Sequence, residues 1–389
     1  MRSKNLIALL TRGIHAGRLD LTLPGGERHA ITGPETGPQA VVTVHRWRTL
    51  RRLAFGGGVG FAESYMDGDW DSPDLAPVIE LAALNRGLAD DGTRPSTTAR
   101  LLHWLRHSLR ANTHKGSRRN IAFHYDLGNQ FYERWLDSTM TYSSAIYAEP
   151  NQSLEEAQRN KYRQLLDRME VQPNQHVLEI GCGWGGFAIL AAKERGLKVT
   201  GITLSQEQHD LAAQRVQEEG LADKINIEIR DYRDVTATYD HVASIEMLEA
   251  VGEQYWPVFF AKIFDSLKSG GRAALQVITI DDRHFESYKR SADFIQTYVF
   301  PGGMLLSPGA LKREVANAGL QWHSDAGFAE DYAKTLRIWR ERFEEKWAEI
   351  EPLGFDERFR RMWRFYLAYC EGGFRAAAID VKQLAIVKA

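Results

Sequence analysis

The sequence predicts an α/β fold in which a doubly wound, Rossmann-like parallel sheet follows a smaller α+β unit. From about residue 170, short apolar runs alternate with helical patterns, which is typical of parallel strands covered by helices on both faces. The first of these runs ends in a glycine-rich turn, as the first strand of a doubly wound fold does. The chain of 389 residues is long enough for two domains.

Three stretches of the chain differ in character. Residues 1–95 mix short apolar runs with turns such as Gly56-Gly57-Gly58, and we expect a small α+β domain there. Residues 96–120 carry many arginines and are predicted to form a basic linker. Residues 121–389 are predicted to contain the doubly wound domain, a helical insert and an aromatic-rich tail.

Five apolar runs are the predicted strands of the large sheet. They are residues 176–180, 198–202, 225–229, 241–245 and 272–278. Helical patterns at 188–194 and 207–219 separate the first three runs. Strands joined through helices pair in parallel, so we expect a parallel sheet.

The composition excludes several classes of protein. A net charge of −2 gives no general attraction for nucleic acid. The only cysteines, Cys182 and Cys370, argue against a disulfide framework and are typical of a reducing cytoplasm, and no Cys/His spacing indicates a metal site. The apolar run 6–10 is too short for a signal peptide, and no run of about 18 apolar residues predicts a membrane span.

The strongest single motif is the turn after the first strand. Gly181, Gly183 and Gly186 have the G-x-G-x-x-G spacing that lets a backbone approach a nucleotide closely. Glu179 lies inside the preceding strand, and Thr203 rather than an acid ends the second strand. Both features favour S-adenosylmethionine (SAM) over a dinucleotide, although an ordinary tight turn is the simpler interpretation.

A second candidate cofactor segment follows the third strand. Asp231 is placed to accept a hydrogen bond from an adenine amino group, and Tyr232 to lie against the ring. A solvated loop is the alternative interpretation.

Several further motifs carry a family resemblance. They are residues 123–129 (Phe-His-Tyr-Asp-Leu-Gly-Asn), 140–145 (Met-Thr-Tyr-Ser-Ser-Ala), 203–208, 231–234, 247–252, 298–303 and 331–336. Together with the glycine turn, they resemble the cyclopropane-fatty-acid synthase family, which includes the mycolic acid cyclopropane synthases. The resemblance covers roughly residues 120–389, and residues 65–70 also look like the amino-terminal lipid-binding domain of the full-length bacterial enzymes.

The resemblance implies a reaction and a set of ligands. In the family, the methyl group of SAM goes to a cis double bond of a phospholipid acyl chain, and a bound bicarbonate takes the proton whose loss closes a cyclopropane ring. Glu249 and Tyr332 match two bicarbonate ligands of the family. Ser144 stands where a cysteine is usual, Gln276 where a histidine is usual, and Ile278 at the backbone ligand.

Glu246 is a further departure, because this position is often glycine in the bacterial enzymes. The pair Glu246 and Glu249, with Gln276, resembles the plant-type branch of the family. Two carboxylates in a dry cleft have coupled titrations. We therefore hypothesise that Glu246 is the proton acceptor or replaces part of the bicarbonate site. The alternative is that both acids only meet the dipole of a helix amino terminus.

The resemblance also extends the cofactor site. It implies that Tyr142 and Ser143 close over SAM and that Thr203 and Gln208 belong to the same site. Tyr142 equally fits a position in the core.

The expected partner is a phospholipid bilayer with unsaturated acyl chains, met from the cytoplasmic side by a peripheral protein. The basic run 100–119 is suited to anionic headgroups, and equally to a solvated linker face. The aromatic residues of 339–369 suit an acyl tunnel, but helix core is the default interpretation. The resemblance suggests a homodimer.

Three other functions remain open at this point. Methyl transfer without ring closure gives a methyl-branched or methylated unsaturated chain. A non-catalytic lipid-binding protein would have lost SAM binding. A small-molecule methyltransferase fits the amino-terminal unit and the tail less well.

Overall fold

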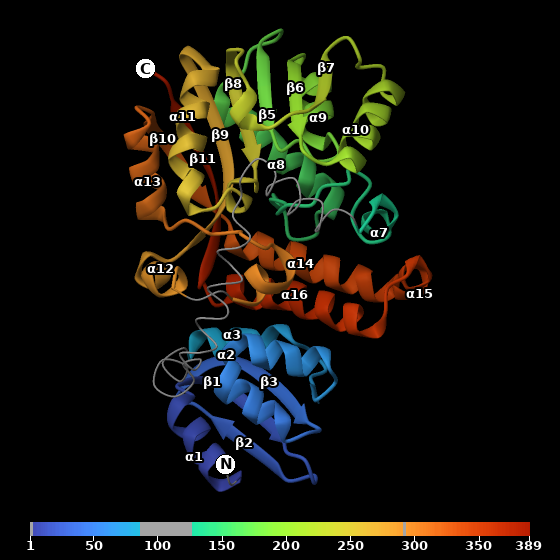
Figure 1. The fold of residues 1–389 in the computed structure, drawn as a ribbon, viewed down its shortest axis with the longest axis vertical. Helices are drawn as coiled ribbons and strands as arrows, with labels where there is room; N and C mark the ends of the chain where they lie inside the picture. Colours follow the sequence, from blue (N-terminus) through green and yellow to red (C-terminus); the bar gives the residue numbers. More distant parts are fainter. Residues whose placement is uncertain (1–2, 86–126, 291–292) are drawn as a thin grey trace. The chain divides into compact units, whose positions relative to one another are not determined.

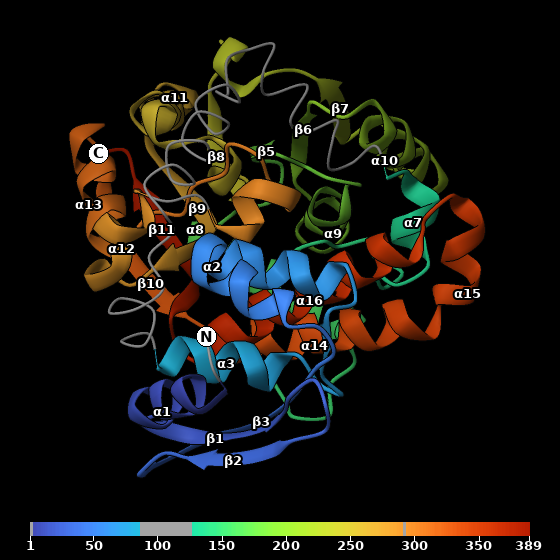
Figure 2. The same cartoon turned by 60° about the horizontal axis from the view of Figure 1, so that its bottom comes forward.

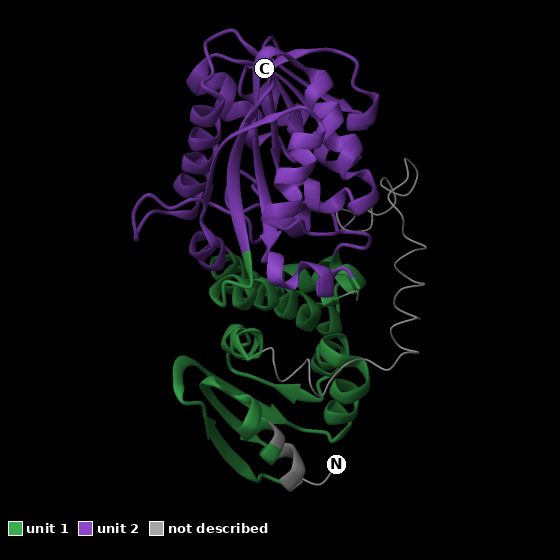
Figure 3. Cartoon of the chain, turned by 90° about the vertical axis from the view of Figure 1, so that its left-hand side faces the viewer, with its two compact units in different colours: residues 1–108, 290–299, 336–379 green, residues 109–289, 300–335, 380–389 purple. Residues whose placement is uncertain are grey.

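The computed structural model describes residues 3–85, 127–290 and 293–389. Figure 3 shows the two compact units into which the chain divides. Unit 1 comprises residues 1–108, 290–299 and 336–379, and unit 2 comprises 109–289, 300–335 and 380–389. The tail 336–379 therefore groups with the amino-terminal residues, although the sequence analysis assigned it to the second domain. The limits at residues 95 and 120 stay predictions, because they lie outside the described residues, as do Arg100–Arg119, His124 and Tyr125.

Unit 1 contains a four-stranded sheet in the order β2-β1-β3-β4 (Figure 1). Its strands are β1 (Ala16–Thr22), β2 (Arg28–Thr32), β3 (Glu35–Val44) and β4 (Trp70–Asp71). Its helical segments are α1 (Ser3–Gly13), α2 (Arg48–Met66), α3 (Ala76–Leu84), η4 (Ile295–Val299), most of α14 (Ala329–Glu345), α15 (Trp347–Ile350), η5 (Glu351–Leu353) and α16 (Glu357–Arg375). The strands β1 and β3 are parallel, and the other pairs are antiparallel.

Close packing holds the tail helices to the amino-terminal helices within unit 1. At Gly372 in α16, an added Cβ would lie 2.7 Å from the Cβ of Ile79 and 2.8 Å from the oxygen of Ala76, so only glycine allows α16 to approach α3 this closely. Trp339 in α14 and Trp363 in α16 are buried. This supports the helix-core interpretation of the aromatic tail.

The segment that resembles a lipid-binding domain forms part of the core of unit 1. Tyr65 and Trp70 are fully buried, and Phe61 stacks on Trp70 at 4.2 Å between ring centroids. The buried carboxylate of Asp69 accepts hydrogen bonds from Arg46 and from the neighbouring Arg48. The residues 65–70 thus stabilise the unit from inside.

Unit 2 is built on a seven-stranded sheet in the order β10-β11-β9-β8-β5-β6-β7, seen in Figure 1 and from another side in Figure 2. The strands are β5 (His176–Ile180), β6 (Lys198–Thr203), β7 (Ile225–Ile229), β8 (Tyr239–Ile245), β9 (Leu267–Ile280), β10 (Gln321–Gly327) and β11 (Ile379–Val387). The pairs β5–β6, β6–β7, β5–β8 and β8–β9 are parallel, and β10–β11 is antiparallel. The five predicted strands are confirmed, and they form the parallel part.

The order of the strands determines where the helices lie. The helical segments of this unit are α7 (Asn129–Glu133), α8 (Leu154–Met169), α9 (Gly186–Arg195), α10 (Gln206–Glu218), η1 (Tyr232–Asp234), η2 (Leu248–Ala250), η3 (Glu253–Tyr255), α11 (Trp256–Ser266), α12 (Asp282–Tyr288) and α13 (Pro308–Asn317). The chain runs outward from β5 through β6 to β7, and then returns to β8 on the other side of β5. Right-handed crossovers in opposite directions place α9 and α10 on one face and α11 on the other. In doubly wound folds ligands bind at such a reversal, which lies here at the carboxyl ends of β5 and β8.

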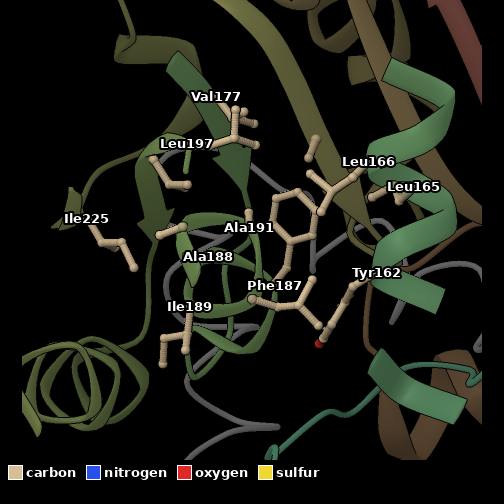
Figure 4. Close-up of a cluster of buried hydrophobic side chains, with 14 of the residues drawn as sticks. Tyr162, Leu165, Leu166, Val177, Phe187, Ala188, Ile189, Ala191, Leu197 and Ile225 are labelled. Carbon is tan, nitrogen blue, oxygen red and sulfur yellow. The ribbon is translucent and has the colours of Figure 1, made fainter. Parts of the chain in front are cut away.

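A hydrophobic cluster fixes α8 and α9 against the sheet, and Figure 4 shows its side chains. Leu165 and Leu166 of α8 meet Phe187 and Ala188 of α9 and Val177 of β5, all with less than 2% of their surface exposed. This packing is rigid support for whatever follows the carboxyl end of β5.

The composition led to two expectations, one on disulfide bonds and one on membrane-spanning helices. Cys182 and Cys370 are not joined in a disulfide bond. Among the described residues, no helix is both long and apolar enough to cross a bilayer.

Candidate active site

The glycine turn lies at the reversal of strand order in unit 2. Gly181 and Gly183 adopt φ values of 83° and 51°, which favour glycine. At Gly181, an added Cβ would also lie 2.8 Å from the side chain of Met247, in the segment after β8. The turn at Gly181 therefore requires glycine for conformation and for space.

Glu179 lies in β5 just before this turn. Its side chain is 3% exposed, and its Oε2 atom has no hydrogen-bond partner within the described part of the chain. Burial raises the pKa of Glu179 well above its ordinary value. A buried acceptor without a partner is costly, so this atom fits a position that a ligand donor completes.

The carboxyl end of β6 is ordered by its own side chains. Thr203 donates a hydrogen bond of 2.8 Å to Oε1 of Gln208, and both side chains are buried. Ser205 caps α10 by accepting from the backbone N–H of Gln208. Thr203 and Gln208 are thus held together at the carboxyl end of β6 and the start of α10.

Asp231 and Tyr232 follow β7, as predicted. The buried carboxylate of Asp231 accepts three hydrogen bonds from Arg233, of 2.6–3.0 Å. Tyr232 packs edge-on against Phe259, and burial raises its pKa to about 12. The sequence analysis missed the role of Arg233, which orients Asp231.

Tyr142 and Ser143 lie in the segment between α7 and α8. Tyr142 is partly exposed and contacts the rings of Tyr132 and Trp135 at 5.4 Å and 5.6 Å between centroids. Ser143 is buried. Tyr142 therefore packs on an aromatic cluster while staying partly exposed, and its contact with SAM stays a prediction.

These residues fit SAM. A glycine turn, a buried carboxylate with a free acceptor atom, and ordered polar side chains lie at the ends of three neighbouring parallel strands, where doubly wound folds bind nucleotides.

The carboxylate of Glu246 is the best-connected group of the site. Its Oε1 accepts from Gln276 Nε2 at 2.7 Å and from the backbone N–H of Ser144 at 2.8 Å. Its Oε2 accepts from the hydroxyl of Tyr332 at 2.5 Å. The structure thus brings together four of the five predicted catalytic residues.

Ser144 contributes differently from the prediction. Its own hydroxyl donates to the oxygen of Ala145 at 2.9 Å, so only its main chain contacts Glu246. The side chain of Ser144 therefore does not replace a cysteine ligand.

Glu246 has a φ of 49°, in the left-handed region that favours glycine. For glutamate this conformation costs about 1–3 kcal/mol. The three hydrogen bonds to the carboxylate offset the strain. A strained backbone at a partly buried carboxylate is typical of a functional site.

Glu249, the fifth predicted residue, lies in η2, one turn further on. Its Oε1 accepts from the backbone N–H of Ile278 at 2.5 Å, and its buried Oε2 has no partner among the residues that the structure describes. Burial and the charge of Glu246 raise the pKa of Glu249 to about 8.

Glu246 and Glu249 differ in how strongly their surroundings favour the ionised form. Burial also raises the pKa of Glu246, but Tyr332, Gln276 and Ser144 act in the opposite direction. Because Glu246 accepts three hydrogen bonds and Glu249 accepts one from Ile278, the hydrogen bonds favour the negative charge on Glu246 and the proton on Glu249.

The residues do not fit a bound bicarbonate, although the resemblance implies one. Tyr332 and Gln276 donate to Glu246, and the N–H of Ile278 donates to Glu249. An additional anion beside the pair would lack these donors and would add a further negative charge to two carboxyl groups.

Sequence reasoning missed three buried polar side chains behind this site. They are Gln158, Lys161 and Gln383. Gln158 and Lys161 interrupt the apolar face of α8, which was a readable signal, whereas Gln383 lies in β11, a strand that was not predicted.

Comparison with known proteins gives a consistent result. The family model described as mycolic acid cyclopropane synthetase matches residues 112–384. A tuberculostearic acid methyltransferase of Mycobacterium tuberculosis is 42% identical over 361 residues, covering 89% of this chain and 82% of that protein. The cyclopropane-fatty-acyl-phospholipid synthase of Escherichia coli K12 is 34% identical over 352 residues, covering 86% and 84%.

Solved structures agree. A mycolic acid cyclopropane synthase crystallised with SAH and CTAB has a TM-score of 0.66 and 27% identity, and the match covers 70% of this chain and 98% of that one.

Glu249→Gln should remove a pH dependence of folding. The folded pKa of Glu249 is about 8 and the unfolded one about 4.3, so the folded state binds this proton more tightly. The contribution of Glu249 to the free energy of unfolding therefore falls as the pH rises between these values. We expect the variant to gain stability relative to the wild type between about pH 5 and 8 in denaturant titrations.

Glu286→Gln is the matched control, because Glu286 is exposed on α12. The free energy of unfolding of Glu286→Gln should equal that of the wild type at about pH 5 and at about pH 8. An unchanged difference between wild type and Glu249→Gln would contradict the raised pKa.

Proposed function

Because the chain belongs to the mycolic acid cyclopropane synthetase family of SAM-dependent methyltransferases, we propose that it methylates a cis double bond in the acyl chain of a membrane phospholipid. The observation that carries the proposal is the strained, triply hydrogen-bonded Glu246 beside Glu249 and the glycine turn. The name of the Escherichia coli relative supports a phospholipid substrate, and that of the Mycobacterium tuberculosis relative supports a fatty acyl substrate.

The site suits a reaction with a weak nucleophile. SAM, when bound, supplies an electrophilic methyl group, and an alkene attacks it only when the two are aligned and water is excluded. The carbocation that forms is stabilised by a neighbouring negative charge. Glu246 supplies that charge, whereas the protonated Glu249 adds no second charge that would attract water.

Glu246 is also the proton acceptor in this proposal. After methyl transfer, the cation must lose one proton to give a neutral product. The Glu246 carboxylate takes it, and Tyr332, Gln276 and the Ser144 N–H fix the direction of the carboxylate. No bicarbonate is required.

The origin of that proton separates two products. Loss from the transferred methyl group, with its C–H electrons forming a new C–C bond, closes a cyclopropane ring. Loss from a neighbouring chain carbon leaves a methylated alkene of the same mass. The second product is supported by the relative that is named a tuberculostearic acid methyltransferase.

Incubation with methyl-labelled SAM and vesicles of cis-unsaturated phospholipid tests the proposal. We expect label in the acyl chains, and NMR of the chains distinguishes cyclopropane methylene signals from a methyl group beside a retained double bond. Label in neither the lipid nor the free fatty acid, with SAM still bound, would rule out the proposed acceptor. No SAM binding would favour a non-catalytic lipid-binding protein.

Turnover should not depend on bicarbonate. We expect the wild-type rate to be equal in carbonate-free and bicarbonate-supplemented buffer, and Glu246→Gln to lower it by roughly 10²–10⁴-fold, as for loss of a general base. Glu246→Gly, which suits the positive φ, opens space for an anion, and added bicarbonate should restore part of its rate. A wild-type rate that falls when carbonate is removed would contradict the assignment of Glu246.

Tyr332→Phe and Ser144→Ala form a second pair. Tyr332→Phe removes a donor to a charged acceptor, worth roughly 1.5–3 kcal/mol, so turnover should fall about tenfold or more. Ser144→Ala keeps the N–H that contacts Glu246, so turnover should stay within about twofold of wild type. The reverse order would show that the Ser144 hydroxyl, rather than its main chain, acts in the site.

A further inference from the structure

A lysine is buried in the apolar face of α8, behind the proposed active site. Lys161 has none of its surface exposed, and its neighbours on this face include Ala157 and Leu165. Its ammonium group donates to Oγ of Ser143 at 2.7 Å and lies 4.5 Å from the ring centroid of Tyr162. Burying an ammonium group costs several kcal/mol unless nearby charges compensate, so the position requires an explanation.

Two hydrogen-bonded routes connect Lys161 to Glu246. Along the first, Lys161 binds Ser143, and the N–H of the next residue, Ser144, donates to Glu246. Gln158 donates to the oxygen of Ser143 at 2.9 Å, so α8 holds Ser143 through both its side chain and its main chain.

Along the second route, Gln383 donates to the oxygen of Lys161 at 3.0 Å and to Oε1 of Gln276 at 3.1 Å. Gln276 in turn donates to Glu246. One residue of α8 therefore supports two of the three donors to the Glu246 carboxylate.

The charged groups around Lys161 also connect it with Glu246. Four titratable groups face the ammonium group: Glu246 after β8, Glu179 in β5, Asp137 in the segment after α7, and Tyr162 in α8 itself. The described residues place no carboxylate within ion-pair distance of Lys161, so the three acids act on it through the low-dielectric interior. Burial lowers the pKa of Lys161 to about 7, while the three acids raise it.

We infer that Lys161 is a positioning residue whose buried ammonium group fixes Ser143 and keeps the carboxylate of Glu246 ionised as the proton acceptor. The inference rests on the proposed function, because it assigns Lys161 a part in that reaction. An opposite charge lowers the pKa of a carboxyl group. Loss of the ammonium group should therefore raise the pKa of Glu246 and favour the protonated form of the acceptor.

Lys161→Met tests the inference, since methionine fills a similar volume without charge. We expect the acid limb of the turnover–pH profile to move to higher pH by about one unit, the lower end of the effect of an opposite charge. The melting temperature should be equal to or above that of the wild type, because replacing a buried charge by an apolar group is often neutral or stabilising. An unmoved acid limb would overturn the inference and leave Lys161 a purely structural residue.

Ser143→Ala separates charge from hydrogen bonding. This variant keeps the ammonium group and loses only its acceptor, so the acid limb should stay at the wild-type pH whatever happens to the rate. An equal shift in both variants would overturn the electrostatic role.

A titration that needs no turnover distinguishes this inference from the proposed function. In protein labelled with carboxyl-¹³C glutamate, the signal of Glu246 is assigned by its loss in Glu246→Gln. Its titration midpoint should move to higher pH in Lys161→Met. If the wild type transfers no methyl group to lipid, the proposed function fails, whereas the midpoint still decides whether Lys161 sets the ionisation of Glu246.

Discussion

Three donors from distant parts of the chain meet at one carboxylate, that of Glu246, and the rest of the site depends on this interaction. The N–H of Ser144, the amide of Gln276 and the hydroxyl of Tyr332 come from three different segments of unit 2. Together they stabilise the ionised form of this partly buried side chain and hold a backbone conformation that glutamate rarely adopts. Glu249 can then carry the proton of the pair.

The position of this carboxylate follows from the topology of the sheet. The strand order reverses between β5 and β8, so the glycine turn and Glu246 leave the sheet at the same edge. A methyl donor held by the turn would therefore be close to the group that receives the proton. The reversal of strand order thus places the cofactor turn and the proposed proton acceptor at one edge of the sheet.

A site of this kind requires polar and charged side chains in the interior of the protein. Those in α8 and β11 lie behind Glu246. Gln158, Lys161 and Gln383 occupy core positions that apolar residues would fill more cheaply. Each contributes to orienting Ser143 or Gln276. These polar side chains therefore occupy interior positions that apolar side chains would otherwise fill.

The sequence by itself determined the parallel sheet, the cofactor turn and the identity of the carboxylates. Strand periodicity, glycine spacing and the family motifs are local features, and the five predicted strands, Gly181 and Glu249 are found where these features placed them. Tertiary structure alone decided that Ser144 acts through its main chain, that the donors converge on Glu246 rather than on a bound anion, and that Lys161 and Gln383 lie behind them. Those facts depend on contacts between residues as many as 222 positions apart, such as that of Gln383 with Lys161, and no local pattern encodes such a distance.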